Sequence, residues 1–397
     1  MNRKGKSLNY LFFVVCLYIL VFQNFLQTII KPFQYFDEIL ALMLIPIVFF
    51  KIFLKRDNKL VIKKNYLIGF VLLMIIFITG IYSNFKFKYQ PSSVYLSDAL
   101  LVFKFFFVYL VGILLWKDTL IKKYEDNINN HVKFIIYLLF ILTILNYIFK
   151  IWPYEYRFGI MTNKLFFSHP TMLAGICIFL LSLLILTSKK INKFDIFVLI
   201  FMLITTLRFK AIGAVVVIFM IIIYVQKSQK KISVTKLGIL SILILILVWD
   251  QVNYYYFEID DSARNQLTIN SFKIAKDYFP FGTGFGTFGS YMSGVNYSPV
   301  YYKYNISNIY GITKGHTEFI SDTFWPMIIG QFGVIGTICY IVCLIMIFKK
   351  IQREFTTESI NIYLSKVICF VYLLIASTSE SAFVHPMAIP LAIVLAL

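Results

Sequence analysis

Four basic residues, Arg157, Arg208, Lys210 and Arg264, are the best placed in this sequence to bind a phosphate. Arg208 and Lys210 lie in a short turn between two apolar runs, and Arg264 opens a candidate helix in a long polar segment. A guanidinium can grip a phosphate through two parallel hydrogen bonds. The alternative is a cation whose stem lies along apolar surface while its charge contacts lipid headgroups. We predict that all four residues contribute to phosphate binding.

Histidine is scarce, and His316 is the one that we predict to act as a general base. A histidine with a pKa near neutrality can take a proton from an attacking hydroxyl. Glu318 is close in sequence and could orient it, although an ordinary loop histidine is the alternative. His131 lies in a segment that we expect on the cytoplasmic side, opposite to the segment that contains His316. His169 and His385 stand at the ends of apolar runs.

The segment from Pro280 to Phe288 contains glycines at every second position, including Gly284 and Gly286. Such a turn lets backbone N–H groups approach an anion closely, so we count both glycines as candidate substrate-binding residues. It equally lets the chain fold back tightly on itself. The spacing differs from the dinucleotide-binding pattern, and the segment follows a predicted helix rather than a strand.

Several ionisable residues lie at the edges of apolar runs, where charge is costly and often functional. They are Asp37, Glu38, Asp98, Lys104 and Glu380. Asp98 and Lys104 are six residues apart and therefore do not meet on one helical turn. An ion pair with another helix is the structural alternative to a functional role. The five cysteines lie inside apolar runs without ligand or disulfide spacing, so we expect no metal site and no cofactor.

The elements that hold these residues must be membrane-spanning helices. The chain has 397 residues, of which 59% are hydrophobic and 14% charged, and its mean hydropathy is +0.79. One soluble core cannot bury so much apolar surface. The formal charge of +19 is spread between apolar runs instead of forming a basic domain, which argues against nucleic acid as a partner.

A span needs about 20 mainly apolar residues. The fold class expected is therefore an all-α integral membrane protein with about twelve transmembrane helices in a single polytopic domain, 1–397. Basic residues concentrate in alternate connecting segments, which predicts that both termini face the cytoplasm. The twelve candidates are residues 9–30, 36–54, 66–83, 95–116, 132–150, 171–187, 194–207, 211–226, 234–249, 324–348, 363–379 and 384–397.

Residues 250–323 form a large extracytoplasmic loop between the ninth and tenth candidate spans. Its aromatic residues argue against disorder. Asp260-Asp261-Ser262 predicts a helix N-cap, and Pro280 predicts the end of that helix. We expect a short amphipathic helix on the outer membrane face, followed by the glycine turn. Tyrosines of this loop, such as Tyr291, Tyr301 and Tyr302, are candidates for stacking on sugar rings.

In order and spacing, these motifs resemble the O-antigen polymerase and ligase superfamily. In that family an arginine opens the helix before a Pro-x-Gly-x-Gly-x-Gly turn, a histidine follows, and Glu-x-Gly-x-x-Gly begins the next span. The corresponding residues here are Arg264, Pro280–Gly286, His316 and Gln331–Gly336. Two positions depart from the pattern, since Thr317 replaces the usual asparagine after the histidine and Gln331 replaces the glutamate. Three segments upstream also resemble motifs of capsular polymerases. They are Asp37-Glu38, Ser97-Asp98 together with Lys104-Phe105, and the Leu-Arg-Phe-Lys-Ala turn at 207–211.

The resemblance implies a multi-helix glycosyltransferase of the C type in the bacterial cytoplasmic membrane, independent of metal and nucleotide sugar. Its substrate would be an undecaprenyl-pyrophosphate-linked oligosaccharide, and a chain-length regulator and a flippase would be its partners. Arg208 and Arg264 would hold the pyrophosphate, and His316 would activate the acceptor hydroxyl.

Two other functions stay open at this stage. A ligase would move finished polysaccharide from the same lipid carrier to another acceptor, with the same donor and topology. A polysaccharide flippase or transporter would also fit about twelve spans with both termini inside. The single large external loop and the lack of similarity between the two halves of the chain favour an enzyme over a transporter.

Overall fold

The computed structural model describes residues 8–43, 64–115, 118–157, 159–188, 192–247, 262–356 and 359–397, together with the single residues 46, 249 and 253. Most of the predicted second span, 36–54, lies outside this part of the chain, as do Asp260 and Asp261.

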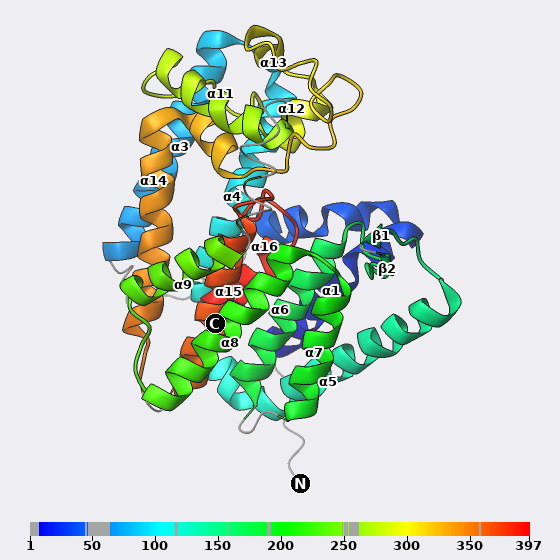
Figure 1. The fold of residues 1–397 in the computed structure, drawn as a ribbon. Coiled ribbons are helices and arrows are strands. Elements are labelled where there is room, and N and C mark those ends of the chain that lie inside the picture. The colour runs from blue at the N-terminus through cyan, green and yellow to red at the C-terminus, as the bar shows by residue number, and fades with distance from the viewer. Residues whose placement is uncertain are drawn as a thin grey trace.

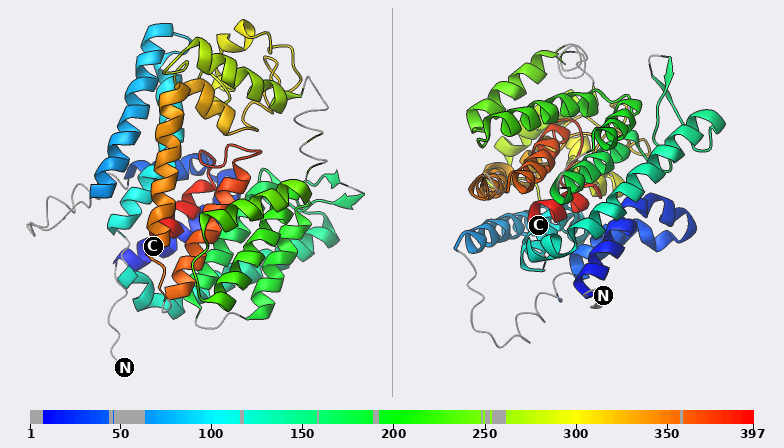
Figure 2. Two further views of the ribbon diagram at one scale, coloured as in Figure 1. Left: turned by 60° about the vertical axis from the view of Figure 1, so that its left-hand side comes forward. Right: turned by 90° about the horizontal axis from the view of Figure 1, so that it is seen from below.

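A bundle of helices forms the lower part of the molecule, and three long helices connect it to an upper part (Figure 1; Figure 2 shows the same arrangement from another side). We call the upper part, residues 262–324, the cap. The bundle contains α1 (Leu8–Ile29), α5 (Asp118–Phe149), α6 (Pro170–Thr187), α7 (Lys193–Thr205), α8 (Phe209–Ser228), α9 (Val234–Leu247), α15 (Ile360–Ala376) and α16 (Ala388–Ala396). The connecting helices are α3 (Lys64–Phe87), α4 (Ser92–Leu115) and α14 (Trp325–Arg353). The cap contains α11 (Ala263–Asp277), α12 (Tyr291–Val295) and α13 (Pro299–Lys303). A short helix, η1 (Lys31–Tyr35), follows α1, and the strands β1 (Tyr156–Arg157) and β2 (Ile160–Met161) form a small antiparallel hairpin.

Helix α6 is the centre of the bundle. It packs against α5, α7, α15 and α16, and every one of its 18 residues is buried. A helix that is apolar on all sides can face either other helices or lipid, so its sequence predicts its helical state and not its position. The tertiary packing places α6 among the other helices.

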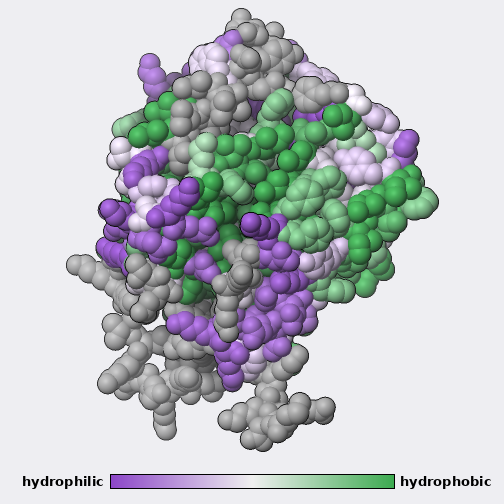
Figure 3. Space-filling view, turned by 60° about the horizontal axis from the view of Figure 1, so that its bottom comes forward, coloured by the Kyte–Doolittle hydropathy of each residue, from purple (hydrophilic) through white to green (hydrophobic). Residues whose placement is uncertain are grey.

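Seven helices in the described part of the chain are long and apolar enough to cross a membrane. They are α1, α3, α4, α5, α6, α8 and α14. This architecture is the one expected of a helical membrane protein. Figure 3 shows a broad hydrophobic area across the molecule, with hydrophilic side chains gathered below it.

Four other predicted spans are helical but short. Helices α7, α9, α15 and α16 contain 13, 14, 17 and 9 residues. A helix rises about 1.5 Å per residue, so over their described residues α7, α9 and α16 are shorter than a complete straight crossing, and α15 is near the lower limit of one. The count of twelve spans therefore stays a prediction, while the helical state of these segments is confirmed.

The glycine turn joins the cap to the membrane helices through backbone packing. Helix α14 contains non-helical backbone at Gly333, and its φ angle of 58° lies in the left-handed region that favours glycine. A Cβ atom built on Gly282 would lie 2.5 Å from the backbone nitrogen of Gly333. Both positions therefore need glycine, because a side chain at either one would force the two backbones apart.

Polar side chains from α3, α4 and α14 satisfy the backbone of this turn. The amide of Asn84 accepts a hydrogen bond from Phe285 N and donates one to Phe285 O, at 2.8 and 2.9 Å. Asp98 accepts one from Gly286 N at 2.7 Å and also bonds the side chains of Ser290 and Gln331. Burial of unpaired backbone groups is costly, so these partners fix the turn in place.

A buried ion cluster links the segment after η1 to α4. Lys104 Nζ contacts carboxylate oxygens of Asp37 and, at 2.8 Å, of Glu38, while Gln23 donates to Asp37 at 2.9 Å. Lys104 and Asp37 have no solvent exposure. For Lys104 the structural alternative of an ion pair with another segment is therefore correct.

Replacement of Lys104 by methionine should destabilise the protein, because it leaves two carboxylates without their cation. Breaking a buried pair in this way costs about 3–5 kcal/mol. All five cysteines are free and buried, so a thiol-reactive dye can report the melting temperature. The same change at exposed Lys122 is the matched control. Equal melting temperatures for the two variants would contradict the role assigned to Lys104.

Candidate functional site

Charged and polar side chains from widely separated segments converge between the cap and the upper end of the bundle. We call this group the charged cluster. Its members interact with one another through hydrogen bonds, ion pairs or electrostatic effects. They are Glu155, Arg157, His169, Thr171, Arg208, Lys210, Arg264, Asp322, Glu380 and His385.

Arg208 stands at the N-cap of α8, where the preceding residue, Leu207, has a φ of 48° that turns the chain sharply. One guanidinium nitrogen lies 3.5 Å from Glu155, while the buried Nε atom has no hydrogen-bond partner. Burial and the neighbouring charge of Arg157 lower the pKa of Arg208. An anion bound here would satisfy the Nε donor and offset the mutual repulsion of the two arginines.

Two ion pairs lie beside Arg208. Lys210 Nζ is 2.7 Å from Glu380, and an Arg264 guanidinium nitrogen is 3.0 Å from Asp322. All four side chains keep partial solvent exposure, between 16% and 33%. Burial raises the pKa of Asp322 even though Arg264 lowers it. The pairs therefore hold two cations at defined positions while leaving them accessible to a ligand.

His169 is bonded into this group at the start of α6. Its Nδ1 atom lies 2.9 Å from the hydroxyl of Thr171, which also bonds Glu380. Burial and the positive charges of Arg208 and Lys210 lower the pKa of His169 to about 3. The residue keeps some solvent exposure and its ring is neutral over the physiological range, but a pKa of about 3 makes it a weak proton acceptor while these positive charges act on it.

His385 connects the charged cluster to the ion cluster of Asp37 and Lys104. It lies in the loop between α15 and α16, which Figure 1 places between the bundle and the cap. Burial lowers the pKa of His385, while Glu380 raises it and Lys104 lowers it further. Charges from α4, α8 and the last loop thus act on a single imidazole.

The structure brings together all four predicted phosphate-binding cations, Arg157, Arg208, Lys210 and Arg264. His316 is 73% exposed, and its ion-pair partner is Glu318, 3.6 Å away and 59% exposed. No interaction between these two residues and the charged cluster occurs in the part of the chain that the structure describes.

The predicted anion-binding glycines have their N–H groups occupied within the protein. Gly284 N donates to the carbonyl of Gln331 at 2.8 Å, and Gly286 N donates to Asp98. The alternative role, a tight turn that docks the cap on the membrane helices, explains both residues. Of the candidate stacking tyrosines, Tyr301 is fully buried in the cap, whereas Tyr291 and Tyr302 are exposed.

Sequence reasoning missed Asp322 and gave His169 no role. Asp322 is the first acidic residue upstream of α14, so its position at the start of a predicted span was a usable signal. His169 comes directly before Pro170, and this pair marks a helix N-terminus facing the same side as Arg208. Among the described residues, no three histidine, cysteine, aspartate or glutamate side chains gather as metal ligands would.

Comparison of the chain with protein-family models, with curated proteins and with solved structures gives no match in any of the three.

The charge arrangement predicts an unusual titration of His169. With a pKa of about 3, it should keep the spectrum of a neutral imidazole at pH 5. Replacement of Arg208 by glutamine should raise this pKa, because a positive neighbour is removed. NMR of histidine-labelled protein can measure the change, since the chain has four histidines and a His169→Gln variant assigns the signal. An unchanged pKa in the Arg208→Gln protein would contradict the proximity of the two residues.

Proposed function

We propose that this protein is a membrane glycosyltransferase that polymerises oligosaccharide repeat units carried on undecaprenyl pyrophosphate. It transfers the growing glycan from its lipid carrier to a lipid-linked repeat unit at the outer side of the cytoplasmic membrane. The observation that carries the proposal is the convergence of Arg157, Arg208, Lys210 and Arg264. The sequence motifs single out these cations, and they come from three segments, β1, the start of α8 and the start of α11.

A pyrophosphate is a good leaving group when fixed cations meet the charge that develops on it. Arg208 and Lys210 lie beside each other at the start of α8, and Arg264 lies across from them at the start of α11. The unsatisfied Nε atom of Arg208 is a donor ready for a phosphate oxygen. These groups would bind the donor and stabilise the departing lipid pyrophosphate.

The acceptor sugar must lose a hydroxyl proton as its oxygen attacks the anomeric carbon. As the new C–O bond forms, the bond to the pyrophosphate breaks and its electron pair stays with the phosphate oxygen. Of the two histidines in the charged cluster, His169 is the more exposed and lies beside Arg208 and Lys210, and we assign it the proton. Bound pyrophosphate offsets the charges of Arg208 and Lys210, so the pKa of His169 rises when substrate is present. The sequence motif favours His316 instead, and the two assignments are distinguishable.

The central test is reconstitution of the purified protein with the lipid-linked repeat unit of its own host. A polymerase gives a ladder of regularly spaced lipid-linked products on a gel. Transfer that occurs only after another acceptor is added would identify a ligase. Movement of substrate across the bilayer without new glycosidic bonds would refute the enzyme and support a transporter.

Histidine variants test the assignment of the proton acceptor. His169→Gln should lower kcat by about 100-fold or more, since general base catalysis contributes about 10²–10⁴. His316→Gln, at an exposed position outside the charged cluster, should retain most of the activity. The measurement is the initial rate of ladder formation at equal protein levels. A large loss in His316→Gln with little loss in His169→Gln would return the role to His316.

A further inference from the structure

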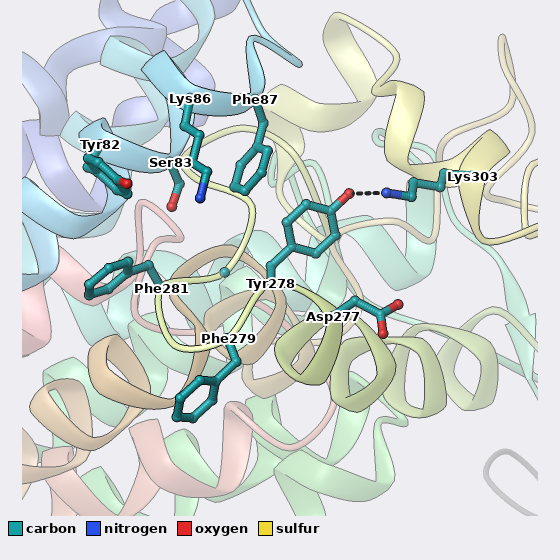
Figure 4. Close-up of a pocket in the computed structure, with 10 residues that line it drawn as sticks. Tyr82, Ser83, Lys86, Phe87, Asp277, Tyr278, Phe279, Phe281 and Lys303 are labelled. Carbon is teal, nitrogen blue, oxygen red and sulfur yellow. Dashed lines mark hydrogen bonds between the residues drawn. The ribbon is translucent and has the colours of Figure 1, made fainter.

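A pocket of about 290 Å³ lies at the far end of α11 from Arg264 (Figure 4). Helix α3, the segment that follows α11 and the short helix α13 each contribute to it. The lining residues are Tyr82, Ser83, Lys86, Phe87, Asp277, Tyr278, Phe279, Phe281, Gly282 and Lys303. Aromatic rings therefore surround a small number of polar groups, as in many sites for small ligands.

Two groups of the pocket are suited to an anion. Ser83 is fully buried, and its Oγ atom has no hydrogen-bond partner. Within the described part of the chain Lys86 forms no ion pair, and its Nζ atom lies 5.9 and 5.3 Å from the ring centroids of Tyr82 and Phe87. Figure 4 shows the Ser83 hydroxyl and the Lys86 amine pointing the same way, toward Phe281. A phosphate oxygen between them would pair the cation and satisfy the hydroxyl.

The remaining charges of the pocket are fixed by neighbouring tyrosines. Lys303 donates to the hydroxyl of Tyr278 at 2.6 Å, and this bond raises the pKa of Lys303, which stays positive. The carboxylate of Asp277 accepts a hydrogen bond from Tyr304 at 2.7 Å. In Figure 4 this carboxylate points away from Lys86 and Ser83. Among the described residues that line the pocket, the side that holds Lys86 therefore has no acidic group.

The surroundings of the pocket are those of a membrane boundary. Helix α3 is apolar enough to cross a membrane from Leu67 to Phe87, so the pocket lies at the end of that span. Large apolar side chains nearby are solvent-exposed in the structure, with Phe85 at 66%, Phe272 at 60% and Phe279 at 70%. Aromatic residues and lysines at the end of an apolar helix are typical of the headgroup level. A lipid-borne anion can therefore reach Lys86 directly.

Helix α11 sets the distance between the pocket and the charged cluster. Arg264 and Asp277 lie near its two ends, thirteen residues apart. At 1.5 Å per residue this separation is about 20 Å. An oligosaccharide of a few sugar residues, attached to a lipid at one end of α11, can reach a reacting carbon at the other end.

We propose that this pocket binds the phosphate-bearing head group of the acceptor, the second lipid-linked substrate. The assignment rests on the proposed polymerase reaction, in which both substrates carry a lipid pyrophosphate. The charged cluster holds the donor, the pocket holds the acceptor by its phosphate and first sugar, and α11 spaces the two. The aromatic walls offer a surface on which that first sugar can stack.

The test counts bound molecules without any reaction. Wild-type protein in nanodiscs of zwitterionic lipid is titrated with farnesyl pyrophosphate, a short-chain probe, and the complexes are counted by native mass spectrometry. We expect two bound molecules. Lys86→Gln should remove one of them, and Arg264→Gln should remove the other. Lys273→Gln, an exposed lysine on α11 outside the pocket, is the matched control and should retain both.

A single bound molecule in the wild type, or two in Lys86→Gln, would refute the pocket. Loss of the second molecule in nanodiscs of anionic phosphatidylglycerol would assign the pocket to bulk lipid and overturn the acceptor role. Because the binding count involves no reaction, the pocket and the polymerase reaction are tested separately. If two molecules bind but the reconstituted protein makes no polymer, the result counts against the proposed enzyme and not against the pocket. With active protein, Lys86→Gln should raise the KM for the acceptor roughly tenfold, equal to 1.4 kcal/mol of lost binding, and leave kcat largely unchanged.

Discussion

The docking of the glycine turn against α3, α4 and α14 is the constraint on which the rest of the molecule depends. The backbone from Pro280 to Gly289 passes through the protein interior, where each N–H and C=O group needs a partner. Asn84, Asp98 and Gln331 provide partners from the membrane helices. Because the turn is fixed at these points, α11 is fixed as well, and with it the position of Arg264. Two residues of the cap, Arg264 and Asp322, thereby join cluster members that come from the bundle and its connecting segments.

The charged cluster is not a set of completed ion pairs, and its unsatisfied positive charge is what suits it to bind an anion. Lys210 and Arg264 have carboxylate partners, but Arg208 approaches Glu155 only to 3.5 Å and keeps an unsatisfied donor. Repulsion from Arg157 makes the arrangement costly without an anion. The same positive charges lower the pKa of His169, so an anion bound to them would raise it. The pocket around Lys86 has a related character, a cation and a hydroxyl that lack partners within the described protein.

The residue roles predicted from single motifs agree less well with the structure than the helices predicted from the segments around them. Gly284 and Gly286 form the tight turn that was the alternative to anion binding, and their N–H groups are used internally. Lys104 forms an ion pair with Asp37 and Glu38, whereas Asp98, only six residues away, serves the glycine turn. His316 and Glu318 lie 3.6 Å from each other, and among the described residues neither pairs with the cations that they were predicted to serve. Spacing along the chain predicts local contacts, and it does not tell which distant segment a side chain will face.

The sequence alone was enough to predict the helical class, most helix positions and the group of basic residues that we propose to hold a phosphate. Apolar runs, capping residues and proline are local signals, and they predicted the helical segments, the N-cap at Ser262 and the end of α11 near Pro280. The tertiary structure decided which histidine joins those basic residues, because His169 and Arg208 are brought together by the packing of α6, α7 and α8. It also decided the partners of each buried charge. Desolvation makes an unpaired charge expensive wherever it lies, but only the folded arrangement of helices specifies which opposite charge is within reach.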